Sequence, residues 1–251
     1  MEIEKNKNIT KLVFPPKKDR LNPYNVFIFH KNKKGFIIDS GNIENGVEIQ
    51  KYIKSQGLDI LGIIFSHYHL DHIGGYQRLD NIPIIIGSSK YDEILQSCNS
   101  LNNLEKFYPT NKITSKVFNI ELAGFKIQCR MMEGHSPCSI IIEIDNEFLH
   151  VGDLIINTED GNNLLPLGWY ELIENHIKNL EYLKTKKRLN WILGHGNIEQ
   201  DIFSKEEAVT ERILYLTKIK DSKGNIGIEE AIKDNMIMFK HLFWHEQNLN
   251  D

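Results

Sequence analysis

Short apolar runs separated by polar turns recur along the first two thirds of the chain. Residues 24–29 and 35–39 are apolar and flank a turn at 32–34, which predicts a β-hairpin. Two further hairpins are predicted, one with its turn at Ala123-Gly124 and one with its turn at Asn146-Glu147. Single strands are predicted at 11–14, 61–65, 82–86 and 190–193, whereas residues 1–10 are polar and are expected to be loose.

Helical spacing of apolar residues appears between these strands and dominates the last third. A helix over 44–56 should end at Gly57, and Ser204 with Glu207 resembles a capping box that opens a helix reaching about residue 220. Further helices are predicted at 88–98, 172–183 and 228–243. The stretches 99–116 and 154–168 look irregular.

This order of elements predicts an α+β fold in which helices cover two sheets. Internal repeats, low-complexity tracts and a convincing linker are all absent from the sequence. We therefore expect one domain over residues 1–251, with the C-terminal helices from about 204 packed on it.

Composition and charge restrict the expected partners and location of the protein more than they restrict its function. The chain has 251 residues, 25% of them charged, and a formal charge of −4, so nucleic acid is not an expected partner. We expect no membrane span and no signal peptide, and hence a cytoplasmic location. Cys98, Cys129 and Cys138 lack disulfide or CxxC spacing and are expected to be thiols.

The richest chemistry lies in the loop 66–75, with sequence SHYHLDHIGG, directly after an apolar strand. His67, His69, Asp71 and His72 fall within six residues. Crowded imidazoles repel one another when protonated and are costly to bury without partners. A divalent cation removes both problems, so the loop predicts a metal site.

Three later strands each end in a glycine followed by a candidate ligand, namely His135, Asp153 and His195. Each Gly-His or Gly-Asp pair alone is weak, but together with the first loop they supply seven ligands. One metal ion uses three or four protein ligands, so seven predict two metal ions that share a bridging ligand.

The HxHxDH loop, followed in order by GHSP, GD and GHG, resembles the metallo-β-lactamase superfamily, and its glyoxalase II-like group in particular. The resemblance runs from about residue 36 to 197 and includes the stretch Ile38-Asp39-Ser40-Gly41. It implies a four-layer αββα sandwich with two divalent ions at one edge, zinc first and iron or manganese as alternatives. It assigns the first ion to His67, His69 and His135 and the second to Asp71, His72 and His195, bridged by Asp153.

The resemblance also implies a reaction, in which a hydroxide bridging the two metal ions attacks a carbonyl, with Asp71 and Asp153 as the catalytic carboxylates. Several subgroups fit poorly. β-Lactamases of this fold typically lack a bridging aspartate, whereas this chain has Asp153. The features we associate with glyoxalase II itself, homoserine lactonases, nucleases and persulfide dioxygenases are missing. Thioester or ester hydrolysis of a small molecule is therefore the central expectation. Four alternatives stay open: a lactonase, a phosphodiesterase, an iron-dependent oxygenase, and a signalling or binding protein. A homodimer is the assembly that we would test for.

Substrate contacts are harder to predict than metal ligands. Tyr68, Ile156, Trp169 and Tyr170 are the candidates, because the segment 153–170 follows the bridging aspartate and contains no Lys or Arg. Such a wall favours an apolar acyl group over a phosphodiester. The remaining histidines are expected to be structural, with His176 packed on a helix and His241 and His245 on a helix surface.

Overall fold

The computed structural model describes residues 1–18, 20–80, 82–114 and 117–249. Its two sheets are built from strands that follow the predicted apolar runs. The larger sheet contains, in spatial order, β1 (Glu2–Asn6), β2 (Ile9–Phe14), β3 (Tyr24–Lys31), β4 (Lys34–Ile38), β5 (Asp59–Ile64), β6 (Ile84–Ser88) and β7 (Asn111–Ile113). The first four strands pair antiparallel and the last four pair parallel.

The smaller sheet follows in the chain. Its spatial order is β12 (Asn190–Ile192), β11 (Phe148–His150), β10 (Ile140–Ile144), β9 (Phe125–Met131) and β8 (Val117–Leu122). Strands β8 to β11 form antiparallel hairpins, and β12 joins β11 in parallel. The three predicted hairpins, β3–β4, β8–β9 and β10–β11, are therefore confirmed.

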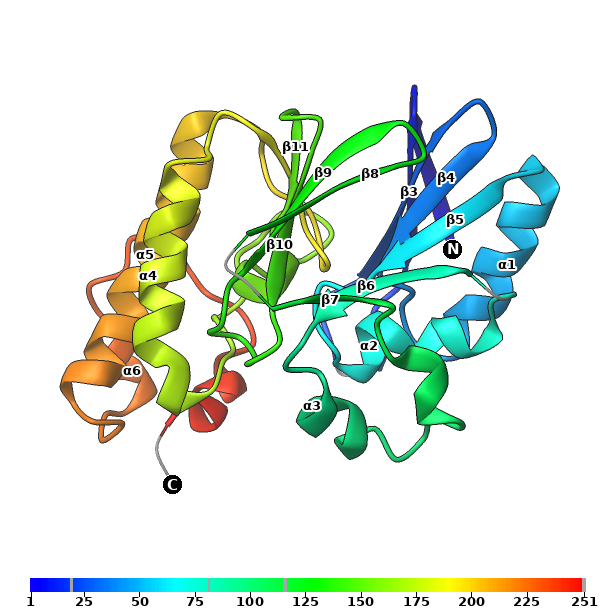
Figure 1. The fold of residues 1–251 in the computed structure, drawn as a ribbon. Coiled ribbons are helices and arrows are strands. Elements are labelled where there is room, and N and C mark those ends of the chain that lie inside the picture. The colour runs from blue at the N-terminus through cyan, green and yellow to red at the C-terminus, as the bar shows by residue number, and fades with distance from the viewer. Residues whose placement is uncertain (19, 81, 115–116, 250–251) are drawn as a thin grey trace.

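Helices cover the outer face of each sheet, so the molecule has four layers, α, β, β and α (Figure 1). On the larger sheet lie α1 (Asn45–Gln56), α2 (Leu70–Ile73), η1 (Gly74–Arg78), α3 (Asp92–Ser97) and η2 (Leu104–Phe107). The other side carries η3 (Gly152–Leu154), η4 (Tyr170–Leu172), α4 (Ile173–Lys184), α5 (Ile202–Asp221), α6 (Ile228–Ile232) and η5 (Leu242–Asn248). None of these described helices combines the length and apolar character that crossing a bilayer requires.

Three apolar clusters hold the four layers together. The inner faces of the two sheets meet in a cluster that includes Phe36, Ile64 and Ile142. Alternate residues of the same strands face outward, where they contact the helices: Ile63 belongs to the cluster under α1 and η1, and Leu149 to the one under α4 and α5. The expected αββα architecture is confirmed.

Three local predictions were wrong. Residues 2–6 form β1, because pairing with β2 satisfies the backbone of this polar stretch. Helix α5 is capped by Asp201, whose carboxylate accepts a hydrogen bond from Ser204 N, so Ser204 lies inside the helix. The predicted helix 228–243 is broken: α6 ends at Ile232, and His241 has φ +54, which an α-helix cannot contain.

The second half of the loop 66–75 packs very closely against the turn after β4. Ser40 N donates to His72 O at 2.6 Å, and Gly75 N donates to Gly41 O at 2.9 Å. A Cβ on Gly75 would lie 1.9 Å from Ser40 O, so only glycine fits. This contact fixes α2, which carries two of the candidate ligands, against the sheet.

We expect Gly75→Ala to lower the free energy of unfolding by about 2–3 kcal/mol, because backbone must move to admit the methyl group. Gly227→Ala is the matched control, since nothing lies within 4 Å of its Cβ position. Its effect should stay below about 1 kcal/mol in urea denaturation. Equal losses in the two variants would contradict this account of the packing.

Candidate metal centre

The candidate ligands gather at one edge of the two sheets, where strands of both end. His67, His69 and α2 follow β5, His135 lies between β9 and β10, and Asp153 and His195 follow β11 and β12. Backbone hydrogen bonds tie the two sheets together at this edge, from Ile140 N to Ser66 O at 2.8 Å and from Asn25 N to Gly194 O at 2.9 Å.

Seven side chains form three overlapping groups in which every donor atom lies within 4.8 Å of the others. The groups are His67, His69 and His135; His67, His72 and Asp153; and Asp71, His72 and His195. The first and third are the two ligand sets that the family pattern implies, and Asp153 lies between them. Its Oδ2 is 3.6 Å from His135 Nε2 and 3.3 Å from His195 Nε2.

The spacing of the donor atoms suits coordination of a metal ion better than hydrogen bonding among the side chains. His69 Nδ1 lies 3.0 Å from both His67 Nε2 and His135 Nε2, yet one ring nitrogen offers a single hydrogen or a single lone pair. Asp153 Oδ1 is buried without a hydrogen-bond partner. Ligand atoms about 2.0–2.1 Å from a tetrahedral ion lie roughly 3.3 Å apart, close to the separations seen here. The residues present therefore suit divalent ions with nitrogen and oxygen ligands.

Four of the imidazoles are oriented by contacts of their other ring nitrogen. His72 Nδ1 lies 2.8 Å from Asp39 Oδ2, His135 Nδ1 2.8 Å from Leu167 O, and His195 Nδ1 2.7 Å from Pro23 O. His67 Nδ1 lies 3.1 Å from the Ser66 hydroxyl. Hydrogen bonds at Nδ1 leave Nε2 as the free ligand atom and fix each ring.

Charge in this buried site is balanced around the carboxylates. Burial raises the pKa of Asp153, but His195, His72 and His67 outweigh it, and the pKa lies well below the ordinary value. Burial lowers the pKa of His72, but Asp153 and Asp39 together raise that pKa well above normal. Burial and neighbouring imidazoles lower the pKa of His67, and that of His69 to about 4. The site thus prefers an ionised Asp153 beside neutral first-group imidazoles, which is the state that binds metal.

A family model described as the metallo-beta-lactamase superfamily matches residues 19–93, which contain the whole HxHxDH loop. The fold agrees: a metallo-beta-lactamase from Pontibacter korlensis superposes with a TM-score of 0.67 at 15% identity, over 84% of this chain and 98% of the other. The family match, the fold and the relatives together support a metallo-β-lactamase superfamily metallohydrolase. At such low identity the solved structure supports the fold alone.

Relatives within the superfamily have different activities. The hydroxyacylglutathione hydrolase GloC of Haemophilus influenzae is 26% identical over 180 residues, which cover 68% of this chain and 84% of that protein. An N-acyl homoserine lactonase of Bacillus cereus is 31% identical over 167 residues, covering 62% of this chain and 63% of the lactonase.

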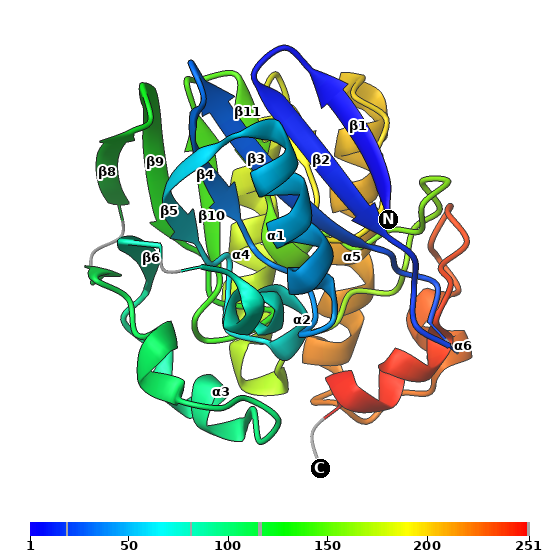
Figure 2. The ribbon, with the colours of Figure 1, turned by 90° about the vertical axis from the view of Figure 1, so that its right-hand side faces the viewer.

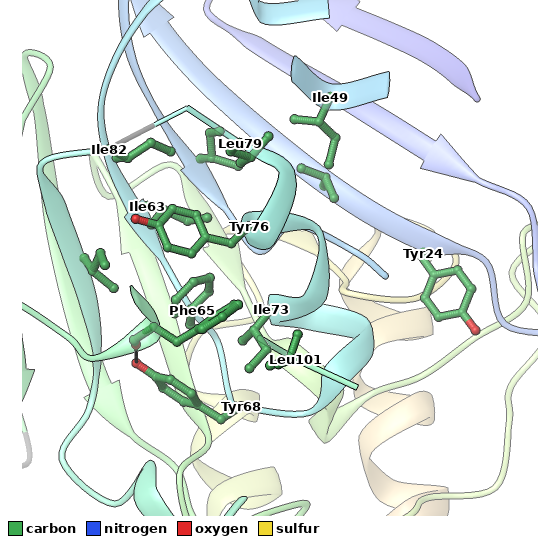
Figure 3. Close-up of a cluster of buried hydrophobic side chains, with 14 of the residues drawn as sticks. Tyr24, Ile49, Ile63, Phe65, Tyr68, Ile73, Tyr76, Leu79, Ile82 and Leu101 are labelled. Atoms are coloured by element: carbon green, nitrogen blue, oxygen red, sulfur yellow. Dashed lines mark hydrogen bonds between the residues drawn. The ribbon is translucent and has the colours of Figure 1, made fainter. Parts of the chain in front are cut away.

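A cavity of about 440 Å³ opens over the two ligand groups. Of the four predicted substrate contacts, Ile156 lines it. Tyr68 does not, which corrects the prediction: its side chain is fully buried beside Phe65 on the far side of the loop, and its hydroxyl donates to Phe107 O (Figure 3). Alternation along the loop points Tyr68 into the core, away from its histidine neighbours.

Trp169 and Tyr170 also lie outside the cavity lining. Trp169 is half-buried against the apolar cluster under the larger sheet, and Tyr170 against the one under the smaller sheet. Their place in the wall is taken by Leu167 and, from η5, by Trp244. A contact from η5 lies too far along the chain from Asp153 for local reasoning to find.

Sequence reasoning missed most of the remaining lining, which comes from the connection between β2 and β3, the first residue of β3 and the turn after β4. It consists of Lys17, Lys18, Arg20, Asn22, Tyr24 and Asn42. The basic run at 17–20 in the sequence was the available signal, although nothing in its spacing placed it near the histidines.

Four of the five other histidines are buried, and two of these four differ from expectation. His150 and His176 are buried core residues, as expected. His245 is 2% exposed rather than on a helix surface, and its ring nitrogens contact the Tyr215 hydroxyl and Ile226 O. His241 is also buried and accepts a hydrogen bond from Leu21 N at 2.7 Å. The three cysteines are free and buried, as predicted.

A buried arginine holds the loop after Asp153 in place. Arg212, fully buried on α5, donates to Ile156 O, Leu164 O and the Asn157 side chain, and burial lowers its pKa to about 9. Within the described residues, no carboxylate pairs with it. The guanidinium therefore acts as a multiple hydrogen-bond donor that fixes Ile156 at the cavity wall.

We expect the reconstituted protein to hold about two metal ions per chain, as seven ligands with one bridge require. Asp153→Ala should reduce occupancy of both positions together, because Asp153 contacts both groups. Asp80→Ala is the control, since its side chain is 70% exposed on the surface. Elemental analysis decides the point, and saturation of the wild type at one ion would refute the dinuclear assignment.

Asp39→Asn should weaken the second position selectively, by about 10- to 100-fold, because it removes the charge that orients and polarises His72. A chelator competition titration resolves the two affinities. The first position, whose ligands do not touch Asp39, should change much less. Equal weakening at both positions would show that Asp39 supports the fold of the loop and not one ligand.

Proposed function

We propose that this protein is a metal-dependent hydrolase that cleaves a small-molecule thioester or ester. The observation that carries the proposal is the makeup of the cavity over the ligand groups. Its described lining contains imidazoles, carboxylates, a phenol and cations, but no serine or cysteine. A reaction at this place that used a serine hydroxyl or a cysteine thiol has no candidate group in this lining, so we assign water as the nucleophile.

The serine hydroxyls and the cysteine thiol behind the ligands also support water as the nucleophile. The Ser66 hydroxyl contacts Asp39 at 2.7 Å, and the Ser136 hydroxyl contacts that of Ser139 at 2.8 Å. Cys138 is fully buried, and burial raises the pKa of its thiol, which keeps it protonated at neutral pH. Each group is engaged in the framework behind the ligands.

Divalent ions in the two ligand groups, zinc first and iron or manganese as alternatives, would make hydroxide available at neutral pH and would polarise a scissile carbonyl. The chain itself contributes a proton donor. Tyr24 lines the cavity, and burial and then Asp71 raise the pKa of its phenol, so the hydroxyl stays protonated. We assign Tyr24 to hydrogen bonding with the departing oxygen or sulfur atom.

The cavity wall favours a substrate with both apolar and charged parts. Ile156, Leu167 and Trp244 supply apolar surface, and a volume of about 440 Å³ suits a small molecule. The segment 153–170 supplies no cation, but Lys17 and Arg20 reach the pocket from a distant segment. A phosphodiester therefore becomes the second candidate, since cations are what its charge requires.

The test compares metal-loaded protein on an acyl thioester, an alkyl ester, a lactone and bis(p-nitrophenyl) phosphate. We expect the thioester to give the highest kcat/KM, Asp153→Ala to abolish turnover, and Asp80→Ala to retain it. Faster cleavage of the phosphodiester would replace the thioesterase assignment and leave the metal centre intact. Oxygen consumption with a thiol substrate, without hydrolysis, would point to an iron-dependent oxygenase.

A further inference from the structure

The connection between β2 and β3 crosses the mouth of the metal cavity. We call residues 15–18 and 20–23 the cationic strap; its Lys17, Lys18 and Arg20 side chains line the cavity. Figure 2 shows this connection running from the blue strands down to the red C-terminal segment. Strap and C-terminal segment, more than 200 residues apart in sequence, thus share one wall.

Contacts at several points hold the strap in place. Leu21 N donates to His241 Nε2 at 2.7 Å, and the Arg20 guanidinium lies over the Phe243 ring, 5.9 Å from its centroid. Lys17 Nζ donates to Asn42 Oδ1 at 2.8 Å at the opposite rim. The cations are therefore positioned at the mouth and are not on a free loop.

The charge of the strap is only partly neutralised. Lys17 pairs with Glu44 at 3.2 Å. Among the described residues, no carboxylate lies within 4.0 Å of the Lys18 or Arg20 charge. The carboxylates of the cavity, Asp71 and Asp153, belong to the ligand groups and are engaged there. Within the part of the chain that the structure describes, two cations at the mouth thus have no ion-pair partner and can accept an anion from outside.

The strap lies on one side of the centre, next to the group of Asp71, His72 and His195. Pro23 O accepts a hydrogen bond from His195 Nδ1 at 2.7 Å, and the Tyr24 ring meets the His195 ring edge-on at 5.3 Å. The Tyr24 side chain, which also lines the cavity, is on the same side. A leaving atom that takes a hydrogen bond from Tyr24 therefore projects its remaining substituents toward the strap.

We propose that the cationic strap binds an anionic group, a carboxylate or a phosphate, on the leaving-group half of the substrate. This rests on the proposed hydrolase function and adds the chemistry of the alcohol or thiol. Water adds across the acyl–sulfur or acyl–oxygen bond, the acyl half departs as a carboxylic acid, and the thiol or alcohol departs with its anion on the strap. The acyl half occupies the side bounded by Leu167 and needs no charge.

The test uses four thioesters. Butyryl-N-acetylcysteamine is neutral, the butyryl thioesters of 3-mercaptopropionate and phosphopantetheine carry the anion on the thiol, and succinyl-N-acetylcysteamine carries it on the acyl group. We expect kcat/KM for the two thiol-anion substrates to exceed that of the neutral one by about tenfold or more, and to fall as salt rises. Comparison of the two distinguishes carboxylate from phosphate as the preferred group.

The ratio to follow is kcat/KM for a thiol-anion substrate divided by kcat/KM for the neutral thioester. The strap variant Lys18→Gln/Arg20→Gln should reduce this ratio about tenfold, because KM for the anionic substrate rises. The matched control Lys34→Gln/Lys178→Gln removes the same charge from two exposed positions, one at the start of β4 and one on α4, and should leave the ratio unchanged. A wild-type ratio near one, a preference for the succinyl substrate, or an equal effect of the control would each overturn the proposal.

A binding experiment tests the cationic strap independently of the hydrolase assignment. Should none of the thioesters turn over, the proposed function fails, while calorimetry with free phosphopantetheine and 3-mercaptopropionate still tests the strap. Wild-type protein should bind at least one of them about tenfold more tightly than the strap variant, with the control variant matching the wild type. Equal binding to all three proteins would remove the strap as an anion site.

Discussion

The arrangement of the site depends on one buried carboxylate, that of Asp153, at the junction of the two sheets. Asp153 is buried between His135 on one side and His195 on the other, and one of its oxygens has no hydrogen-bond partner among the described residues. Such a buried charge costs several kcal/mol unless cations approach it. Metal ions between the carboxylate and the imidazoles meet that requirement, and much of the loop packing around β5, β11 and β12 serves to bring these atoms together.

The same requirement explains the crowding of backbone around the ligands. A Cβ on Gly194 would lie 3.0 Å from Asp153 Oδ1 and 2.9 Å from His72 Cε1, so a larger residue before His195 would press on both groups. Asp39 and Ser66 fill the space behind the histidines with hydrogen-bonding groups. The centre is therefore supported by a polar layer that orients the imidazoles before any ion binds.

The parts of the molecule that local pattern controls could be predicted from sequence. Apolar runs gave the hairpins, and glycine-preceded ligands at strand ends gave a metal centre whose donor atoms do converge. Long-range contacts were out of reach. Nothing near Trp244 or Lys17 in the sequence shows that both line the metal cavity, and Tyr68 was misplaced because its neighbours are ligands while its own side chain alternates into the core.

The hydrogen bond between Leu21 and His241 joins the two ends of the chain at the cavity mouth, away from the strand ends that carry the ligands. The candidate metal ligands and the residues at the cavity mouth therefore come from separate stretches of the sequence. In the proposed function, side-chain substitutions in residues 15–18, 20–21 or 241–248 can change which molecules enter without altering a candidate metal ligand. A scaffold divided in this way can acquire new substrates by small steps, each of which keeps a working catalyst.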